Sequence, residues 1–92
     1  MPIMRAPSVV CKTFKIPCSG EGIFVAINME LYDACMVYWD GTRWTKIVSS
    51  GTVTIDDVTV QDGTATVIVS NDSGYYSSTR VCFIPGDPLA SN

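Results

Sequence analysis

The 92 residues include six basic and nine acidic side chains, four cysteines and no histidine, so the net charge is −3. The basic residues are scattered, and the sequence therefore offers no cationic face for the phosphates of a nucleic acid. Because histidine, the usual proton shuttle at neutral pH, is absent, we expect no enzyme, no small-molecule substrate, no cofactor and no metal. A chain this short forms one domain with a small core, which a disulfide, a partner or self-assembly would support.

The first eight residues hold two prolines and no hydrophobic periodicity, and they predict an arm that leads to a domain over residues 9–86. The arm lacks the apolar core of a secretory signal, and no stretch of the chain reaches the ~18 apolar residues of a membrane helix. We therefore expect synthesis in a cytoplasm and no membrane partner. Residues 87–92 are expected to form a loose tail.

The first half of the domain is expected to contain two long strands. One covers residues 9–16 and ends at Pro17. The other, residues 23–31, shows the clearest alternation in the chain, and the set of odd-numbered residues that begins with Ile23 is expected to face the core.

A hairpin is predicted next, with strands over residues 35–39 and 43–48. Its turn is Asp40-Gly41-Thr42, because Asp-Gly accommodates the positive φ that tight hairpin turns require. The hairpin places two tryptophans five residues apart, one on each side of the turn. Facing aromatic side chains of this kind brace paired strands.

The second half repeats the pattern of short strands and turns. Residues 53–60 form two apolar steps around Asp56-Asp57, and Asp62-Gly63 predicts another tight turn. A strand rich in β-branched residues follows over 64–70, and the last strand is expected over 75–84. Turn signals every 8–12 residues without a helical pattern predict an all-β sandwich of seven to eight short antiparallel strands.

Residues 53–74, VTIDDVTVQDGTATVIVSNDSG, resemble the second half of an immunoglobulin domain of the intermediate (I) set. Asn71 and Gly74 fall where that family turns between its last two strands. Trp39, followed by Asp40-Gly41, is similar to the core tryptophan of the family's third strand. The resemblance implies an Ig-like sandwich and, as an analogy of fold, says little about function.

The sequence departs from that family at the positions that secure its core. Ala65 stands at the position of the family's corner tyrosine, and Val67 at that of its second disulfide cysteine. Met29 lies near the position of the first disulfide cysteine. The intersheet disulfide of antibody domains is therefore not expected, and a partner is a plausible source of the missing stability.

Residues 37–47, VYWDGTRWTKI, resemble the W-D-G-T-x-W hairpins of tail-fibre and other structural proteins of bacteriophages. The tryptophans either stabilise the hairpin alone or form an aromatic contact surface for a neighbouring subunit. The second hypothesis predicts that Trp44→Ala weakens assembly more than it lowers the melting temperature. The candidate protein-contact residues are Tyr38, Trp39, Arg43, Trp44, Tyr75 and Tyr76.

None of the four cysteines forms a Cys-x-x-Cys metal or redox motif. They are either free thiols, mostly buried, or they include one structural disulfide. Because Cys11 and Cys82 fall on the first and last predicted strands, they are the preferred pair. The other two are Cys18 and Cys35.

Two polar clusters are candidate sites. Asp56 and Asp57 are neighbours on a strand and point to opposite faces, so a solvated loop is the first interpretation. Calcium binding together with Asp62 is the alternative, although the spacing is not that of an EF-hand. Asn71-Asp72-Ser73 is either a turn or a glycosylation sequon.

We expect a non-enzymatic structural protein that binds its neighbours. The first hypothesis is a phage virion component, either a capsid decoration (cement) protein or a tail-associated protein, whose docking on a lattice offsets a marginal core. Its partners would be other virion proteins or further copies of the chain, and it would join the virion after synthesis in the host cytoplasm. The alternatives are an extracellular or cell-surface Ig-like adhesion module and a small inhibitor with an exposed edge strand.

Overall fold

The computed structural model describes residues 10–49, 51–73 and 78–86. It consists of seven antiparallel strands, and these residues contain no helix that is long and apolar enough to cross a lipid bilayer. The predicted arm and tail lie outside the described residues. The strands are β1 (Val10–Pro17), β2 (Gly22–Asn28), β3 (Asp33–Trp39), β4 (Trp44–Val48), β5 (Val53–Gln61), β6 (Thr64–Asn71) and β7 (Thr79–Pro85).

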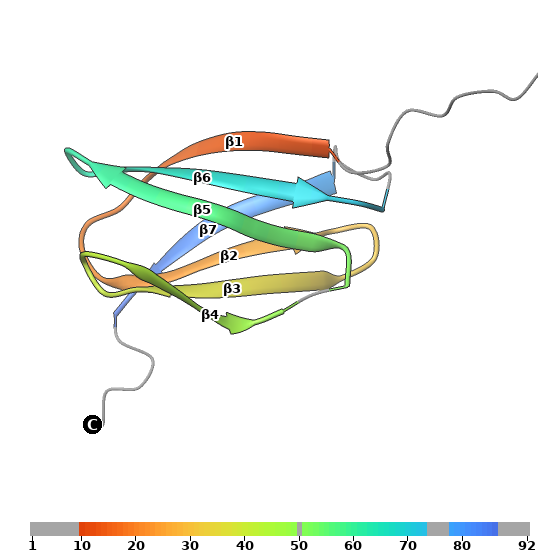
Figure 1. Cartoon of the computed structure of the whole chain (residues 1–92), viewed down its shortest axis with the longest axis horizontal. Helices are drawn as coiled ribbons and strands as arrows, with labels where there is room; N and C mark the ends of the chain where they lie inside the picture. The colour runs from red at the N-terminus through yellow and green to blue at the C-terminus, as the bar shows by residue number, and fades with distance from the viewer. Residues whose placement is uncertain (1–9, 50, 74–77, 87–92) are drawn as a thin grey trace, which may run out of the picture.

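The strands form two layers. A three-stranded sheet has the order β1-β6-β5, and a four-stranded sheet has the order β4-β3-β2-β7. In Figure 1, β1, β6 and β5 run together at the top, and the other four strands run below them. The predicted all-β sandwich is therefore confirmed.

The strand order is compatible with that of immunoglobulin domains. In that family one sheet has the order A-B-E-D, and the other sheet, G-F-C, gains strands C′ and C″ in the variable type. The orders β1-β6-β5 and β7-β2-β3-β4 correspond to B-E-D and F-C-C′-C″, and the β5-β6 hairpin takes the places of D and E. The long-range pairs are β1 with β6 and β2 with β7. The fold is thus compatible with an Ig-like sandwich in its two layers and in its strand order, although residues 53–74 form an earlier pair of strands than the resemblance implies.

The core lies between the layers and is built from one face of each strand. On β6 the alternate residues Ala65, Val67 and Val69 are fully buried. Half-buried Phe14 and Phe83 pack against this core from β1 and β7. The core residues are Cys18, Phe24, Ala26, Cys35, Val37, Trp39, Val53, Ile55, Val58, Ala65, Val67 and Val69.

The predicted orientation of the second strand is wrong. Its even-numbered residues Phe24 and Ala26 face the core, whereas Ile23 is half-buried on the other face. The strand also ends at Asn28, so that Met29 and Leu31 lie beyond it and are exposed. Both faces of this strand are apolar, and period-two alternation identifies two faces without showing which of them is buried.

The two Asp-Gly turns are confirmed. Gly41 has φ +105°, and Asp62 and Gly63 have φ +53° and +77°, the left-handed conformation that a two-residue hairpin turn requires. The two apolar steps predicted over residues 53–60 form a single strand, β5, which carries a β-bulge between Ile55 and Asp57. The last strand begins later than predicted, at Thr79, and residues 74–77 lie outside the described part of the chain.

Candidate functional site

The outer face of the four-stranded sheet is apolar, and we refer to it as the sheet face. The strand register arranges its side chains in three rows that cross the strands. Val25 on this face is buried although it does not belong to the core, because neighbours on the same face cover it. The central row is Cys82, Val25, Met36 and Val48; one end row is Ile84, Ile23, Tyr38 and Thr45; the other is Arg80, Ile27 and Ala34.

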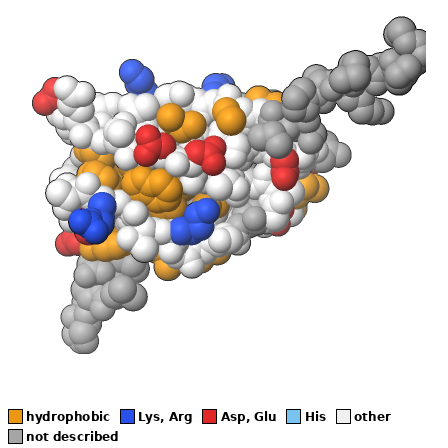
Figure 2. All heavy atoms as spheres, viewed as in Figure 1, with side chains coloured by type: hydrophobic (Ala, Val, Ile, Leu, Met, Phe, Trp, Pro, Cys, Tyr) orange, Lys and Arg blue, Asp and Glu red, His pale blue; other side chains and the backbone are white. Residues whose placement is uncertain are grey.

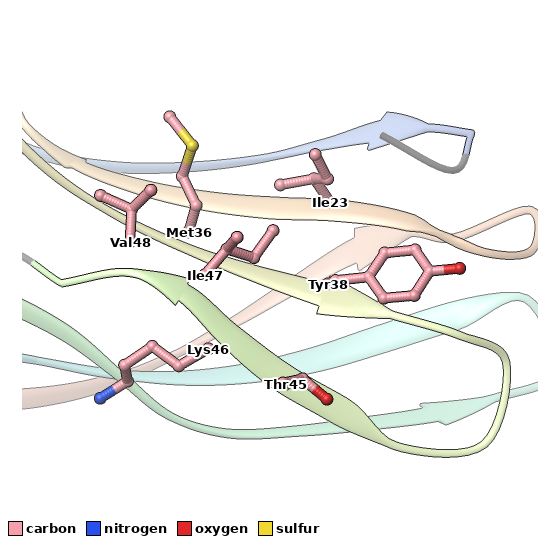
Figure 3. A pocket seen from close by; sticks show the side chains of 7 residues that line it. All are labelled: Ile23, Met36, Tyr38, Thr45, Lys46, Ile47 and Val48. Carbon is pink, nitrogen blue, oxygen red and sulfur yellow. The ribbon is translucent and has the colours of Figure 1, made fainter. Parts of the chain in front are cut away.

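A hollow of about 420 Å³ lies on the sheet face over β2, β3 and β4. Figure 3 shows Ile23, Met36 and Val48 pointing to the same side of the sheet, with the Tyr38 ring along one end. The register shifts by one residue at Met36, and this bulge inserts Ile47 beside the hollow. The lining residues are Ile23, Met36, Tyr38, Thr45, Lys46, Ile47 and Val48.

Several hydrophobic side chains of the sheet face are open to solvent. Ile47 is 48% exposed, Val48 is 41% exposed and Ile84 is 52% exposed. Together they extend from one edge strand, β4, to the other, β7. Single exposed hydrophobic residues are ordinary on a protein surface, but a contiguous set around a hollow is typical of a binding surface.

The polar groups of the sheet face lie at its ends. The hydroxyl group of Tyr38 donates a hydrogen bond to the Glu21 carboxylate, and the Glu21 carbonyl oxygen accepts from the Gly86 N–H at 3.0 Å. Glu21 thereby lies at the end of the sheet where β2 begins. Arg80, on β7, is exposed at the opposite end and pairs in register with Ile27.

The hairpin between β3 and β4 is held by one carboxylate. Oδ1 of Asp40 accepts the backbone N–H groups of Arg43 and Thr42 at 2.9 and 2.8 Å, and the Thr42 hydroxyl at 3.1 Å. These hydrogen bonds, that from the Arg43 backbone first, hold the pKa of the Asp40 carboxyl below its ordinary value of 3.8. The local network fixes the turn and the pairing of Trp39 with Trp44.

Of the predicted contact residues, only some lie on the surface. Trp39 is 7% exposed and belongs to the core, and Trp44 is half-buried and packs against that core. The tryptophans therefore stabilise the hairpin from inside, and Trp39 offers no contact surface in the folded protein. Tyr38 lines the hollow, and Arg43 is exposed beside the turn. Tyr75 and Tyr76 lie outside the described residues.

All four cysteines have free thiols. Cys18 and Cys35 are buried, and Cys11 and Cys82 are exposed. Cys11 alternates with the inward-facing residues of β1, and Cys82 with those of β7, so the two thiols point outward from different sheets. The preferred pair is therefore not bonded in this structure, and Cys82 lies on the sheet face.

A buried asparagine organises the end of the sandwich at which β2 stops. Nδ2 of Asn28 donates to Ser73 Oγ at 2.8 Å and to Thr52 Oγ1 at 3.3 Å, while its Oδ1 accepts the N–H groups of Glu30 and Leu31. One side chain thus ties three connections together. The sequence did not indicate this role, because the alternation along the strand places Asn28 in the set of residues expected to face outward.

The loop after Asn28 exposes hydrophobic residues. Tyr32 is 82% exposed and has φ +61°, although it is not a glycine. Its N–H donates to the Asn28 carbonyl oxygen at 2.7 Å, which closes the turn. Met29 and Leu31 are also exposed.

The acidic pair, Asp56 and Asp57, is exposed to solvent, as expected, but it lies in strand β5 and not in a loop. The bulge between Ile55 and Asp57 interrupts the alternation of faces at Asp56, and Asp62 lies in the turn at the end of the strand. Figure 2 shows acidic side chains over β5 and basic ones over β3 and β4, with hydrophobic side chains between them. Among the described residues, no group of three or more acidic or cysteine side chains is arranged to hold a metal ion.

Comparisons with known proteins gave no match: no protein-family model, no curated protein and no solved structure matches this chain. The site is therefore interpreted from its own chemistry.

Proposed function

We propose that this chain is a non-enzymatic structural protein that binds a neighbouring protein subunit through the sheet face. The observation that carries the proposal is the hollow between β2 and β4, where Ile47 and Val48 stay exposed beside Met36. Burying such side chains against a partner stabilises a complex by roughly 25 cal/mol per Å² of apolar surface before the costs of association. Aromatic and methionine side chains are typical of the centre of such interfaces.

Two of the four edge strands, β5 and β4, are protected against strand addition, which favours docking by the face. The edge strand β5 carries a bulge and the exposed pair Asp56 and Asp57. The edge strand β4 is paired to β3 across another bulge and carries exposed Lys46. Bulges and charges on edge strands block pairing with another chain. The sheet face has no comparable protection at its centre.

The partner class that we propose is a set of bacteriophage virion subunits, in a capsid decoration or tail-associated role. The support is the resemblance of residues 37–47 to hairpins of phage structural proteins. In this structure that hairpin is formed by β3 and β4, and the same two strands supply most of the lining of the hollow. The motif and the binding surface are therefore parts of one element.

A virion incorporation assay tests the proposal. Ile47→Asp places a charge beside the hollow without touching the core, and we expect incorporation into purified particles to fall roughly tenfold or more. Thr59→Asp, an exposed change on β5 of the other sheet, is the matched control and should incorporate normally. Wild-type protein that is absent from particles, or equal incorporation of both variants, would refute the proposal.

A further inference from the structure

We propose that the sheet face binds a second copy of this chain, face to face, about a twofold axis that runs across the strands along the central row. The inference rests on the proposed function and names its partner. Closed dimers use the same patch on both subunits, so the patch has to complement itself. The arrangement of size and charge on the sheet face satisfies this condition.

The register defines the axis. The central row passes through the middle residue of each of the seven-residue strands, namely Cys82 of β7, Val25 of β2 and Met36 of β3. With a twofold axis along this row, each strand lies over the same strand of the second copy, and the two run in opposite directions. Cys82 then faces Cys82 of the second copy, and Met36 faces Met36. Methionine is flexible enough to fill an irregular hollow.

The end rows complement each other in size. Reversal places the row of Ile84, Ile23 and Tyr38 opposite the row of Arg80, Ile27 and Ala34 of the second copy. The large Tyr38 ring therefore meets the small Ala34 side chain, and isoleucine meets isoleucine. Pairing large with small side chains lets two packed sheets interdigitate at their usual ~10 Å separation.

The charges complement each other in the same arrangement. Glu21 lies at the end of the sheet face where β2 begins, and Arg80 at the other end. Reversal brings the Arg80 end of each copy over the Glu21 end of the other. A twofold axis parallel to the strands would instead bring Glu21 toward Glu21. Like charges across an interface oppose association, so the crosswise axis is favoured.

The area of the sheet face is that of a weakly associating dimer. Four strands spaced ~4.8 Å apart, with up to seven residues at ~3.3 Å each, give a face of roughly 450 Å², or about 900 Å² for two copies. Specific interfaces begin near ~1,000 Å², so we expect a dimer that dissociates on dilution from about 1 mM to about 1 μM.

Sedimentation velocity across this concentration range, combined with crosslinking of thiols, tests the inference. Wild-type protein should sediment as a concentration-dependent dimer. A short bismaleimide should join two Cys82 thiols, each thiol adding across the C=C bond of one maleimide group, because sheets ~10 Å apart hold the Cα atoms too far apart for a direct disulfide. Cys11→Ser should crosslink as wild type does, whereas Cys82→Ser should remain dimeric without crosslinking.

Charge reversal adds a test that does not depend on the thiols. Arg80→Glu should raise the dimer dissociation constant roughly tenfold, and adding Glu21→Arg should restore it. Circular dichroism of each variant confirms folding. A wild-type monomer at every concentration, or crosslinking through Cys11 instead, would overturn the inference. If the protein is monomeric while Ile47→Asp still abolishes virion incorporation, the second copy is refuted and the proposed function stands.

Discussion

Asn28 shows how much one side chain contributes to the end of the sandwich. It is fully buried and hydrogen-bonds with groups from three separate connections. Removing a buried polar side chain leaves its hydrogen-bond partners unsatisfied, at a cost of about 1–3 kcal/mol in the free energy of unfolding. A second buried asparagine, Asn71, extends the network. Its Oδ1 accepts the Ser73 hydroxyl at 2.7 Å, and its Nδ2 donates to Thr79 Oγ1 at 2.7 Å.

We predict that Asn28→Ala lowers the free energy of unfolding by about 1–3 kcal/mol, because Ser73, Thr52 and two loop amides each lose one hydrogen bond to its side chain. A domain of this size loses roughly 4–8 °C in melting temperature per kcal/mol. Urea denaturation measures the change, with the exposed Thr59→Ala as the control. Equal midpoints for the two variants would show that the network adds nothing to stability.

Tyr32 gives the opposite prediction, a gain in stability. A non-glycine residue in the left-handed region costs roughly 1–2 kcal/mol, and relief of that strain exceeds the ~0.5–1 kcal/mol of extra chain entropy that glycine brings. Tyr32→Gly should therefore raise the free energy of unfolding, whereas Tyr32→Ala, which keeps the strain, should not. Chemical denaturation of both variants distinguishes them, and equal effects would contradict the argument.

At the scale of the element, the hairpin of β3 and β4 depends on the charge of Asp40. Its pKa is lower in the folded than in the unfolded chain, so its contribution to stability is complete above the ordinary value of 3.8 and is lost as the pH falls through the lowered folded value. We predict that NMR titration finds this pKa below 3.8 and that the hydrogen-exchange protection factors of the Thr42 and Arg43 amides fall on acidification. In Asp40→Ala, these protection factors should be low at every pH.

The position of the Trp44 ring decides whether Trp44→Ala mainly affects assembly or mainly affects stability. The sequence predicted a greater effect of Trp44→Ala on assembly than on melting temperature. Because the ring packs against the core, we now predict the reverse. Removing the half-buried Trp44 ring should lower the free energy of unfolding by about 2–3 kcal/mol, less than the ~3–5 kcal/mol that a fully buried ring contributes. Thermal unfolding beside an incorporation assay checks this, and a large assembly defect without loss of stability would restore the earlier hypothesis.

The predictable elements are those that local chemistry determines. Asp40-Gly41 and Asp62-Gly63 identified two hairpins, because few residue pairs adopt the φ values of these turns. The orientation of β2 was not predictable, because both of its faces are apolar. Of the candidate site, Tyr38 was predictable from the hairpin motif. Ile47 was not, since an exposed isoleucine in a strand has the same sequence pattern as a buried one.

At the scale of the whole molecule, two long-range strand pairs close the sandwich. β1 pairs with β6, and β2 pairs with β7. Between them the chain forms only local units, namely the β2-β3-β4 meander and the β5-β6 hairpin. Non-local pairing of this kind makes folding slow, on the order of milliseconds to seconds.

We predict that a chain truncated after Asp72 does not fold, because β2 would lose its neighbour and Phe24 would lose the ring of Phe83, whose centroid lies 4.7 Å away. One-dimensional NMR would show the narrow amide dispersion of an unfolded chain. Adding a peptide of residues 73–86 in trans should restore dispersion if the missing strand is the cause. A truncated chain with native-like dispersion would contradict this dependence.

The pairing of β2 with β7 also has a consequence for biosynthesis. A strand made early has to wait for almost the whole domain to be translated before it gains its second neighbour. While the nascent chain emerges, the ribosome-bound meander presents hydrophobic side chains on both faces. Chaperones that bind such surfaces would therefore meet this protein on the ribosome, and slowing translation would lengthen their encounter.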